Sequence, residues 1–347
     1  MNGIRRKAAA AALTLLLPLP IAQSAFAAPG PAAHTSSDAY GPLALPRPTG
    51  PHAVGRTVLH LVDKHRPDPW VPAAGARQLM VSMYYPAHAG TGDPAPYMTV
   101  GEARLLLAAK VPGGSLPAET VSSTRTWART DARPVAGRYP LVVLSPGLDL
   151  QRSSLTGLAE DLASRGYVVA LVDHTYEALG VTFPDGRTLA CAICDRRDIT
   201  PKAVGVSRVR DLSFVLDRLT SHHPAWRDAR LIDARRIGMA GHSFGGDATA
   251  LAMAADQRIR AGANLDGTFF APFPAAGLNH RPFLLLGNQQ DMVPGKESSW
   301  DDAWQHMNGW KRWLTVAGAD HSSFRPGSAL RGAGQAHTRR EDPRATW

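Results

Sequence analysis

Apolar positions along the chain follow two different periods, which predicts strands that alternate with helices. Short apolar runs bounded by turn residues are typical of strands, and they occur at residues 58–62, 79–85, 141–144, 167–172, 260–265, 282–287 and 313–316. Helical spacing of apolar residues occurs between residues 155 and 163 and again between residues 206 and 219. Because helices separate successive strands, we expect a mostly parallel central sheet with helices on both faces.

One pentapeptide in this pattern is a candidate catalytic motif, namely Gly-His-Ser-Phe-Gly at residues 241–245. An apolar run at 237–240 precedes it and a helix-like run at 247–255 follows it, which makes the order strand, G-x-S-x-G, helix. This is the nucleophile elbow of an α/β-hydrolase fold, in which the glycines let strand and helix pass closely. We therefore expect Ser243 to be an exposed nucleophile, with the Phe244 N–H at the helix N-terminus directed at an oxyanion.

A serine nucleophile in this fold needs an acid and a general base that follow it in the chain, in the order Ser, Asp or Glu, His. His321 follows the predicted strand at 313–316 and a small turn, so we expect it to be the base. Two carboxylates could orient it. Asp266 ends the strand at 260–265, and Asp291 follows the strand at 282–287, so the residues by themselves leave both candidates open.

Five segments together resemble the secreted lipases and esterases of the platelet-activating-factor acetylhydrolase type, namely residues 140–148, 162–169, 241–246, 265–267 and 321–324. In that family the acid follows the earlier strand, which implies Asp266 here. The family also takes one oxyanion N–H from the residue after the glycine of a His-Gly-Leu turn, which matches Leu148. This chain has Pro146 in place of that histidine, a difference that concerns the shape of the loop because the oxyanion hole consists of backbone N–H groups.

The reaction implied is hydrolysis of a small-molecule or lipid carboxylic ester by a monomeric enzyme, without a metal or an organic cofactor. A peptidase or amidase would share the triad chemistry, and a non-catalytic binding protein could share the fold. The segment between Asp266 and the next strand is too short for a large cap domain. Phe269 and Phe270 in this segment could line an open substrate pocket, or could simply pack under a loop.

The first 27 residues have the layout of an export signal, with basic residues before an apolar stretch and Ala-Phe-Ala at 25–27 as the cleavage motif. The apolar stretch is short and interrupted by prolines, which argues against a membrane anchor. We expect a secreted protein cleaved near Ala27, and the pair Arg5-Arg6 leaves a twin-arginine export route open. The expected division is 1–27 signal peptide, 28–54 disordered leader rich in Pro and Ala, 55–326 hydrolase domain and 327–347 polar tail.

The formal net charge of the chain is +9. Acidic residues stand among the arginines, as in Asp-Arg-Arg-Asp at 195–198, which is typical of a solvated surface. Nucleic-acid binding is not indicated, because no basic stripe with interleaved aromatic residues occurs. The positive charge allows at most weak peripheral contact with anionic lipid.

The only two cysteines, Cys191 and Cys194, form a C-x-x-C pair. Such a pair can be redox-active, but this one lies in a loop-like stretch and not at the start of a helix. In an exported protein we expect it to be a local disulfide.

Overall fold

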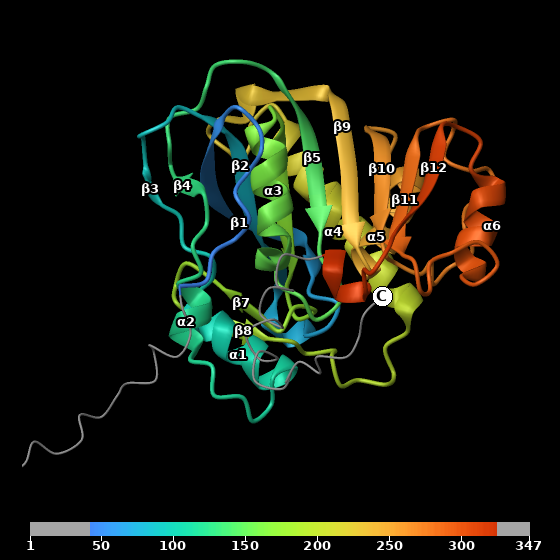
Figure 1. Ribbon diagram of the computed structural model, residues 1–347, viewed down its shortest axis with the longest axis horizontal. Helices are drawn as coiled ribbons and strands as arrows, with labels where there is room; N and C mark the ends of the chain where they lie inside the picture. Colours follow the sequence, from blue (N-terminus) through green and yellow to red (C-terminus); the bar gives the residue numbers. More distant parts are fainter. Residues whose placement is uncertain (1–41, 325–347) are drawn as a thin grey trace, which may run out of the picture. The chain divides into compact units, whose positions relative to one another are not determined.

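A computed structural model describes residues 42–324 of the chain. Within this range ten strands form one central sheet, which Figure 1 shows in ribbon form. Across the sheet the strands are ordered β12 (Lys311–Val316), β11 (Phe283–Asn288), β10 (Ile259–Leu265), β9 (Ile232–His242), β5 (Tyr139–Ser145), β6 (Val168–His174), β2 (Ala76–Ala87), β1 (Ala53–Pro67), β4 (Ala128–Thr130) and β3 (Asp93–Pro94).

The six strands from β12 to β6 are parallel to one another, as the sequence predicts. β2 pairs antiparallel with β6 and with β1, and the short strands β4 and β3 continue the sheet beyond β1. The chain crosses from β5 to β6 in one direction and returns to β9 on the other side of β5. Ligand sites of such sheets lie at the carboxyl ends of the strands where the order reverses.

Four helices flank the sheet, namely α3 (Thr156–Ser164), α4 (Pro201–Thr220), α5 (Phe244–Ala255) and α6 (Ser298–His306). Figure 1 shows α3 on one face, with α4 and α5 on the other. Alternate residues of β6 face opposite sides. Val168 and Val172 belong to the apolar cluster that contains residues of α4 and α5, whereas Val169 and Leu171 belong to the cluster that contains residues of α3. The strand is buried on both sides, which explains why it is an unbroken apolar run.

The stretch between β3 and β4, where the sequence predicts no element, forms two helices, α1 (Val100–Lys110) and α2 (Ala118–Ser122). Thr99 and Glu102 form a capping box that satisfies the first N–H groups of α1. These helices have a small apolar core of their own and lie near the hairpin β7 (Gly180–Thr182) and β8 (Thr188–Ala190) (Figure 1). Residues 266–282, after β10, contain no helix or strand, in agreement with the expected lack of a cap there.

Part of the predicted leader, residues 42–54, is described and differs from the expectation of disorder. Leu45 is buried, Ala44 forms a bridge with Arg125, and the Thr49 N–H donates to Asp161 Oδ1 at 2.8 Å. The predicted signal peptide, the rest of the leader and the polar tail lie outside the described residues. Among residues 42–324, no helix combines the length and the apolar character needed to cross a membrane.

Candidate functional site

The turn between β9 and α5 carries Ser243 in a backbone conformation that non-glycine residues seldom adopt, with φ 55° and ψ −123°. Two glycines make the turn possible. A Cβ on Gly241 would lie 2.1 Å from the backbone of Gly245, and a Cβ on Gly245 would lie 1.9 Å from the Ser145 carbonyl oxygen. Larger residues at either position would push α5 away from the sheet, so the glycines determine how Ser243 is presented.

The loop after β5 passes directly beside Ser243. A Cβ built on Gly147 would lie 3.3 Å from the Cβ of Ser243. The next residue in this loop is Leu148, and Leu148 and Phe244 pack against the same apolar cluster. Within residues 42–324, neither the Leu148 N–H nor the Phe244 N–H donates to another group of the protein. Two unpaired donors beside one serine can bind a developing negative charge.

His321 begins a short 3-10 turn, His321–Phe324, and its Nδ1 lies 2.7 Å from Asp266 Oδ2. Asp266 is fully buried at the end of β10, whereas the His321 side chain is 55% exposed. Burial by itself would raise the pKa of Asp266, but hydrogen bonds from His321 and Asn288 outweigh it and hold this pKa below its ordinary value. The carboxylate therefore stays ionised and accepts the Nδ1–H of the imidazole.

Asp291, the other candidate acid, does not reach His321. Asp291 is exposed, and its backbone N–H donates to the side chain of Asn288 at 2.8 Å. Of the two carboxylates that the residues left open, the structure brings only Asp266 to the histidine.

Two polar residues that the sequence analysis did not single out support this pair. The Asn288 N–H donates to Asp266 Oδ1 at 2.6 Å, and the Asn288 side-chain amide contacts the same carboxylate. His242 Nε2 lies 2.8 Å from the His321 carbonyl oxygen, and the two imidazole rings pack 4.6 Å apart. The signals were present in the sequence, because Asn288 ends a strand adjacent to β10 and His242 occupies the first variable position of the elbow motif.

The predicted pocket residues Phe269 and Phe270 differ in burial in the structure. Phe269 is only 6% exposed and packs edge-to-face on Phe273 in the main core, so it does not line an open surface. Phe270 is 42% exposed and stacks on Phe244, with 4.3 Å between ring centroids. Packing under the loop is thus the correct interpretation for Phe269. Of the two residues, only Phe270 is exposed enough beside the elbow to contact a substrate.

The predicted disulfide between Cys191 and Cys194 is present. Cys191 packs with Leu148 and Phe244 around the cluster formed by Trp70, Ile193 and Val204. The disulfide loop therefore shares an apolar cluster with the two residues that carry the unpaired N–H groups.

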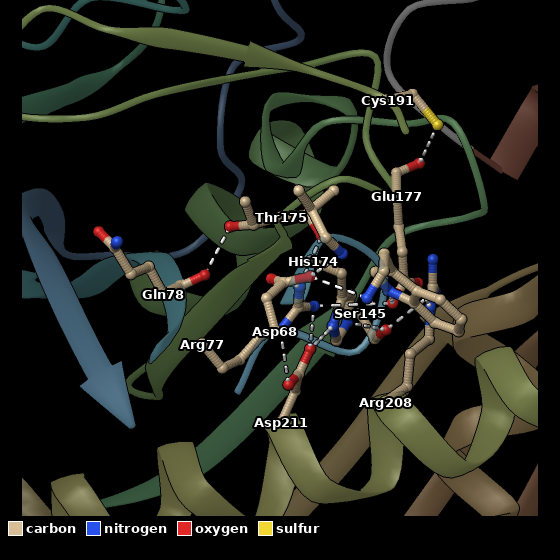
Figure 2. Close-up of polar contacts among 12 residues, drawn as sticks. Asp68, Arg77, Gln78, Ser145, His174, Thr175, Glu177, Cys191, Arg208 and Asp211 are labelled. Carbon is tan, nitrogen blue, oxygen red and sulfur yellow. Dashed lines mark hydrogen bonds and ion pairs between the residues drawn. The ribbon is translucent and has the colours of Figure 1, made fainter. Parts of the chain in front are cut away.

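One group of side chains has the spacing of metal ligands. Donor atoms of His174, Glu177 and Asp211 lie within 4.8 Å of one another. However, Figure 2 shows that the guanidinium groups of Arg77 and Arg208 bind the two carboxylates. Because arginine cations already neutralise these oxygens, the group does not fit a metal ion.

The serine elbow, the His-Asp pair and the sheet topology define an α/β-hydrolase. A sequence model of the family "Platelet-activating factor acetylhydrolase, isoform II" matches residues 39–187. This range starts well before the first segment of the resemblance, at residue 140, and ends before Ser243. The solved structure of a ferulic acid esterase from Streptomyces cinnamoneus is 45% identical, with a TM-score of 0.72, over 82% of this chain and 79% of that chain.

Two curated relatives have related names. A probable 1-alkyl-2-acetylglycerophosphocholine esterase of Arthroderma benhamiae is 29% identical over 84% of this chain and 78% of that protein. The platelet-activating factor acetylhydrolase of Bos taurus is 29% identical over 54% of this chain and 48% of that protein. The chain belongs to the family of esterases that are similar to platelet-activating factor acetylhydrolase, and it is a carboxylic ester hydrolase.

Proposed function

We propose that the chain cleaves esters through Ser243, His321 and Asp266. The observation that carries the proposal is the 2.7 Å hydrogen bond between His321 Nδ1 and buried Asp266, at the sheet edge where Ser243 leaves β9. With its proton on Nδ1, the imidazole has a lone pair on Nε2. His321 Nε2 takes the proton of Ser243 Oγ as Oγ attacks the ester carbonyl carbon, and then donates that proton to the leaving alcohol.

The Leu148 and Phe244 N–H groups stabilise the negative oxygen of the tetrahedral intermediate. Asp266 orients the imidazole and stabilises its cationic form. Water then attacks the acyl group on Ser243 with His321 again acting as the base, and this step releases the carboxylic acid.

The direct test is Ser243→Ala. This substitution should abolish labelling by a fluorophosphonate and lower turnover by several orders of magnitude, about 10⁴-fold or more, because a triad without its nucleophile does not form the acyl-enzyme. An unchanged melting temperature would show that the fold is retained. Labelling that persists in the variant would mean that another residue is the nucleophile.

The preferred substrate in this proposal is an ester of an aromatic acid. Phe270 offers an exposed ring that stacks on Phe244, the residue whose N–H faces the reacting carbonyl. An aromatic acyl group can stack in the same direction and bury apolar surface. The similarity to the ferulic acid esterase gives independent support.

A panel of four compounds tests this preference: ethyl ferulate, 4-nitrophenyl acetate, a 1-alkyl-2-acetylglycerophosphocholine and the anilide of ferulic acid. We expect the highest kcat/KM for ethyl ferulate and the lowest for the anilide, because an amide has a poorer leaving group. A preference for the acetylated phospholipid would assign the site to lipid substrates. Faster cleavage of the anilide would make the protein an amidase.

Export is also part of the proposal, on the basis of the basic, apolar and Ala-Phe-Ala sequence at residues 1–27. Protein recovered from the culture medium should begin near Ala28. An intact N-terminus on the active protein would contradict the assignment of a cleaved signal.

A further inference from the structure

A buried ionic cluster contacts Ser145, the last residue of β5 before the loop that carries Leu148 (Figure 2). Arg208 on α4 is 1% exposed, and its Nε donates to Glu177 Oε2 at 2.7 Å. Arg77 bridges the remaining carboxylates, with 2.6 Å to Asp211 and 2.9 Å to Asp68. Arg66 also binds Asp211, so three arginines face three carboxylates and the charges are compensated inside the protein, as buried ions require.

The rest of the Arg208 guanidinium binds three consecutive residues, the last of β5 and the first two of the loop. Nη1 donates to Ser145 Oγ at 3.3 Å and to the Pro146 carbonyl oxygen, and Nη2 donates to the Gly147 carbonyl oxygen at 3.4 Å. Five N–H groups in a rigid plane can hold several acceptors at once, which a lysine ammonium group cannot do in the same geometry.

The Gly147 carbonyl and the Leu148 N–H belong to the same peptide unit. In a planar trans peptide these two groups point in opposite directions. When Arg208 fixes the direction of the carbonyl, it therefore also fixes the direction of the N–H, which points away from the buried arginine. Gly147 lies against Ser243, so this N–H is held at the side of the loop next to the serine.

A second chain of hydrogen bonds supports the same contact. Asp211 Oδ2 lies 2.9 Å from His174 Nδ1, and His174 Nε2 lies 2.9 Å from Ser145 Oγ. Burial and the neighbouring Arg208 cation lower the pKa of His174 below its ordinary value, although the hydrogen bond to Asp211 opposes this. A neutral His174 donates a hydrogen bond to Asp211 through Nδ1 and accepts one from the Ser145 hydroxyl through Nε2. The lone pairs of the Ser145 oxygen can then accept a hydrogen bond from Arg208.

Arg208 and Asp211 are three residues apart on α4, so they lie on the same face of the helix. The series of hydrogen bonds thus begins at Asp211 on α4, passes through His174 and Ser145, and ends at Arg208 on the same helix. We propose that Arg208 is a positioning residue for ester hydrolysis, because it aims the Leu148 N–H at the oxyanion without touching the substrate. This inference rests on the proposed function, in which Leu148 supplies an oxyanion donor.

The test is Arg208→Lys, which keeps the positive charge but cannot hold all the loop carbonyls. Loss of one oxyanion donor lowers kcat by about 10²- to 10³-fold, so we expect a loss of about 10- to 100-fold for a misaligned donor, with KM nearly unchanged. The affinity for a trifluoromethyl ketone, which forms a tetrahedral adduct, should fall by a similar factor. All rates are expressed per active site titrated to completion with a fluorophosphonate.

Arg281→Lys is the matched control. Arg281 is also a buried arginine that donates to backbone carbonyl oxygens, among them those of Leu278 and Ile259. It stands just before β11, at the amino end of that strand, and so away from Ser243. This variant should lose stability and keep its kcat per titrated site. An equal fall of kcat in both variants would overturn the inference, because it would show a general effect of a lost buried arginine.

Ser145→Ala is the second variant, in case Arg208→Lys does not fold. It removes only the hydroxyl between His174 and Arg208, so we expect a smaller fall in kcat, again with ketone affinity falling in parallel. Wild-type kcat in Ser145→Ala and in any folded Arg208→Lys protein would overturn the inference while labelling at Ser243 still supports the proposed function. A wild-type protein that is not labelled at Ser243 would instead contradict the proposed function itself.

Discussion

Asp266 directly follows β10 and Asn288 ends the neighbouring parallel strand β11, and both the backbone and the side chain of Asn288 donate to the carboxylate that contacts His321. Asn288 is the last residue of β11, and Asp291, the alternative acid, follows it three residues later in the chain. The carboxylate and its hydrogen-bond donor thus come from two adjacent strands. This arrangement keeps the charge of Asp266 in a fully buried position.

We predict different results for the two aspartates near this strand edge. Asp266→Asn should keep the fold and lower kcat by about 10⁴-fold, because an amide favours the wrong tautomer of His321. Asp291→Asn is the control and should retain wild-type kcat, since its side chain is exposed and does not reach the histidine. Steady-state kinetics on both purified variants decides the assignment, and a severe loss in Asp291→Asn would reverse it.

The two neighbouring phenylalanines should also respond differently. Phe269→Ala removes a buried ring and should reduce the free energy of unfolding by about 3 to 5 kcal/mol. Phe270→Ala should leave that energy nearly unchanged and lower kcat/KM for ethyl ferulate more than for 4-nitrophenyl acetate. Urea unfolding and the two kinetic assays measure these effects. Equal losses with both esters would show that Phe270 does not select the acyl group.

Glu160 provides a prediction about pH and stability. Burial raises its pKa to about 7, although the backbone N–H groups of Ala128 and Trp127 partly oppose this. The folded state therefore binds one more proton than the unfolded state between about pH 4.5 and 7. Stability from this group is present below the unfolded pKa and is lost as the pH rises through the folded pKa.

Glu160→Gln removes the titrating proton and should be more stable than the wild type at pH 8, by about 1 to 3 kcal/mol. The difference should become small near pH 4, where most wild-type side chains are also neutral in both states. Chemical unfolding at the two pH values measures it. The same difference at both values would mean that packing, and not titration, causes the effect.

The disulfide loop should influence catalysis more than stability. The loop between Cys191 and Cys194 is short, so replacing both cysteines by alanine should cost only about 2 kcal/mol of stability. Because Cys191 packs against the same apolar cluster as Leu148 and Phe244, we expect a measurable fall in kcat in the same variant. Dithiothreitol should reproduce that fall in the wild type and have no effect on the double variant. Unchanged kcat after verified reduction would separate the disulfide from the site.

The central part of the fold could be predicted from local patterns. Fully buried parallel strands are apolar runs, and the elbow at residues 241–245 combines a strand end, two glycines and a helix start. Helix α1 was missed because its three leucines, residues 105–107, are consecutive and do not follow a helical period. The capping box at Thr99 and Glu102 was the available signal for its start.

The polar interior could not be predicted in the same way. Arg208 lies in a helix with a clear apolar face, where a charged residue ordinarily points to solvent. Its partners Glu177 and Pro146 are 31 and 62 residues away in the chain, so only the folded structure shows that the arginine is buried. Phe269 and Phe270 could not be distinguished for a related reason. Residues in a loop do not follow a helical or strand period, so the sequence does not show which of two neighbours is buried.

Ser145, His174 and Asp211 have a consequence for recognising hydrolases by geometry. Their hydrogen bonds run in the order serine, histidine, aspartate, whereas among residues 42–324 the Ser243 hydroxyl forms no hydrogen bond to His321. A template search based on hydrogen bonds would therefore select the buried set first. Accessibility reverses that choice, because the His174 side chain is 2% exposed and that of His321 is 55% exposed. A Ser-His-Asp template becomes selective for reactive serines when it also requires that solvent can reach the histidine.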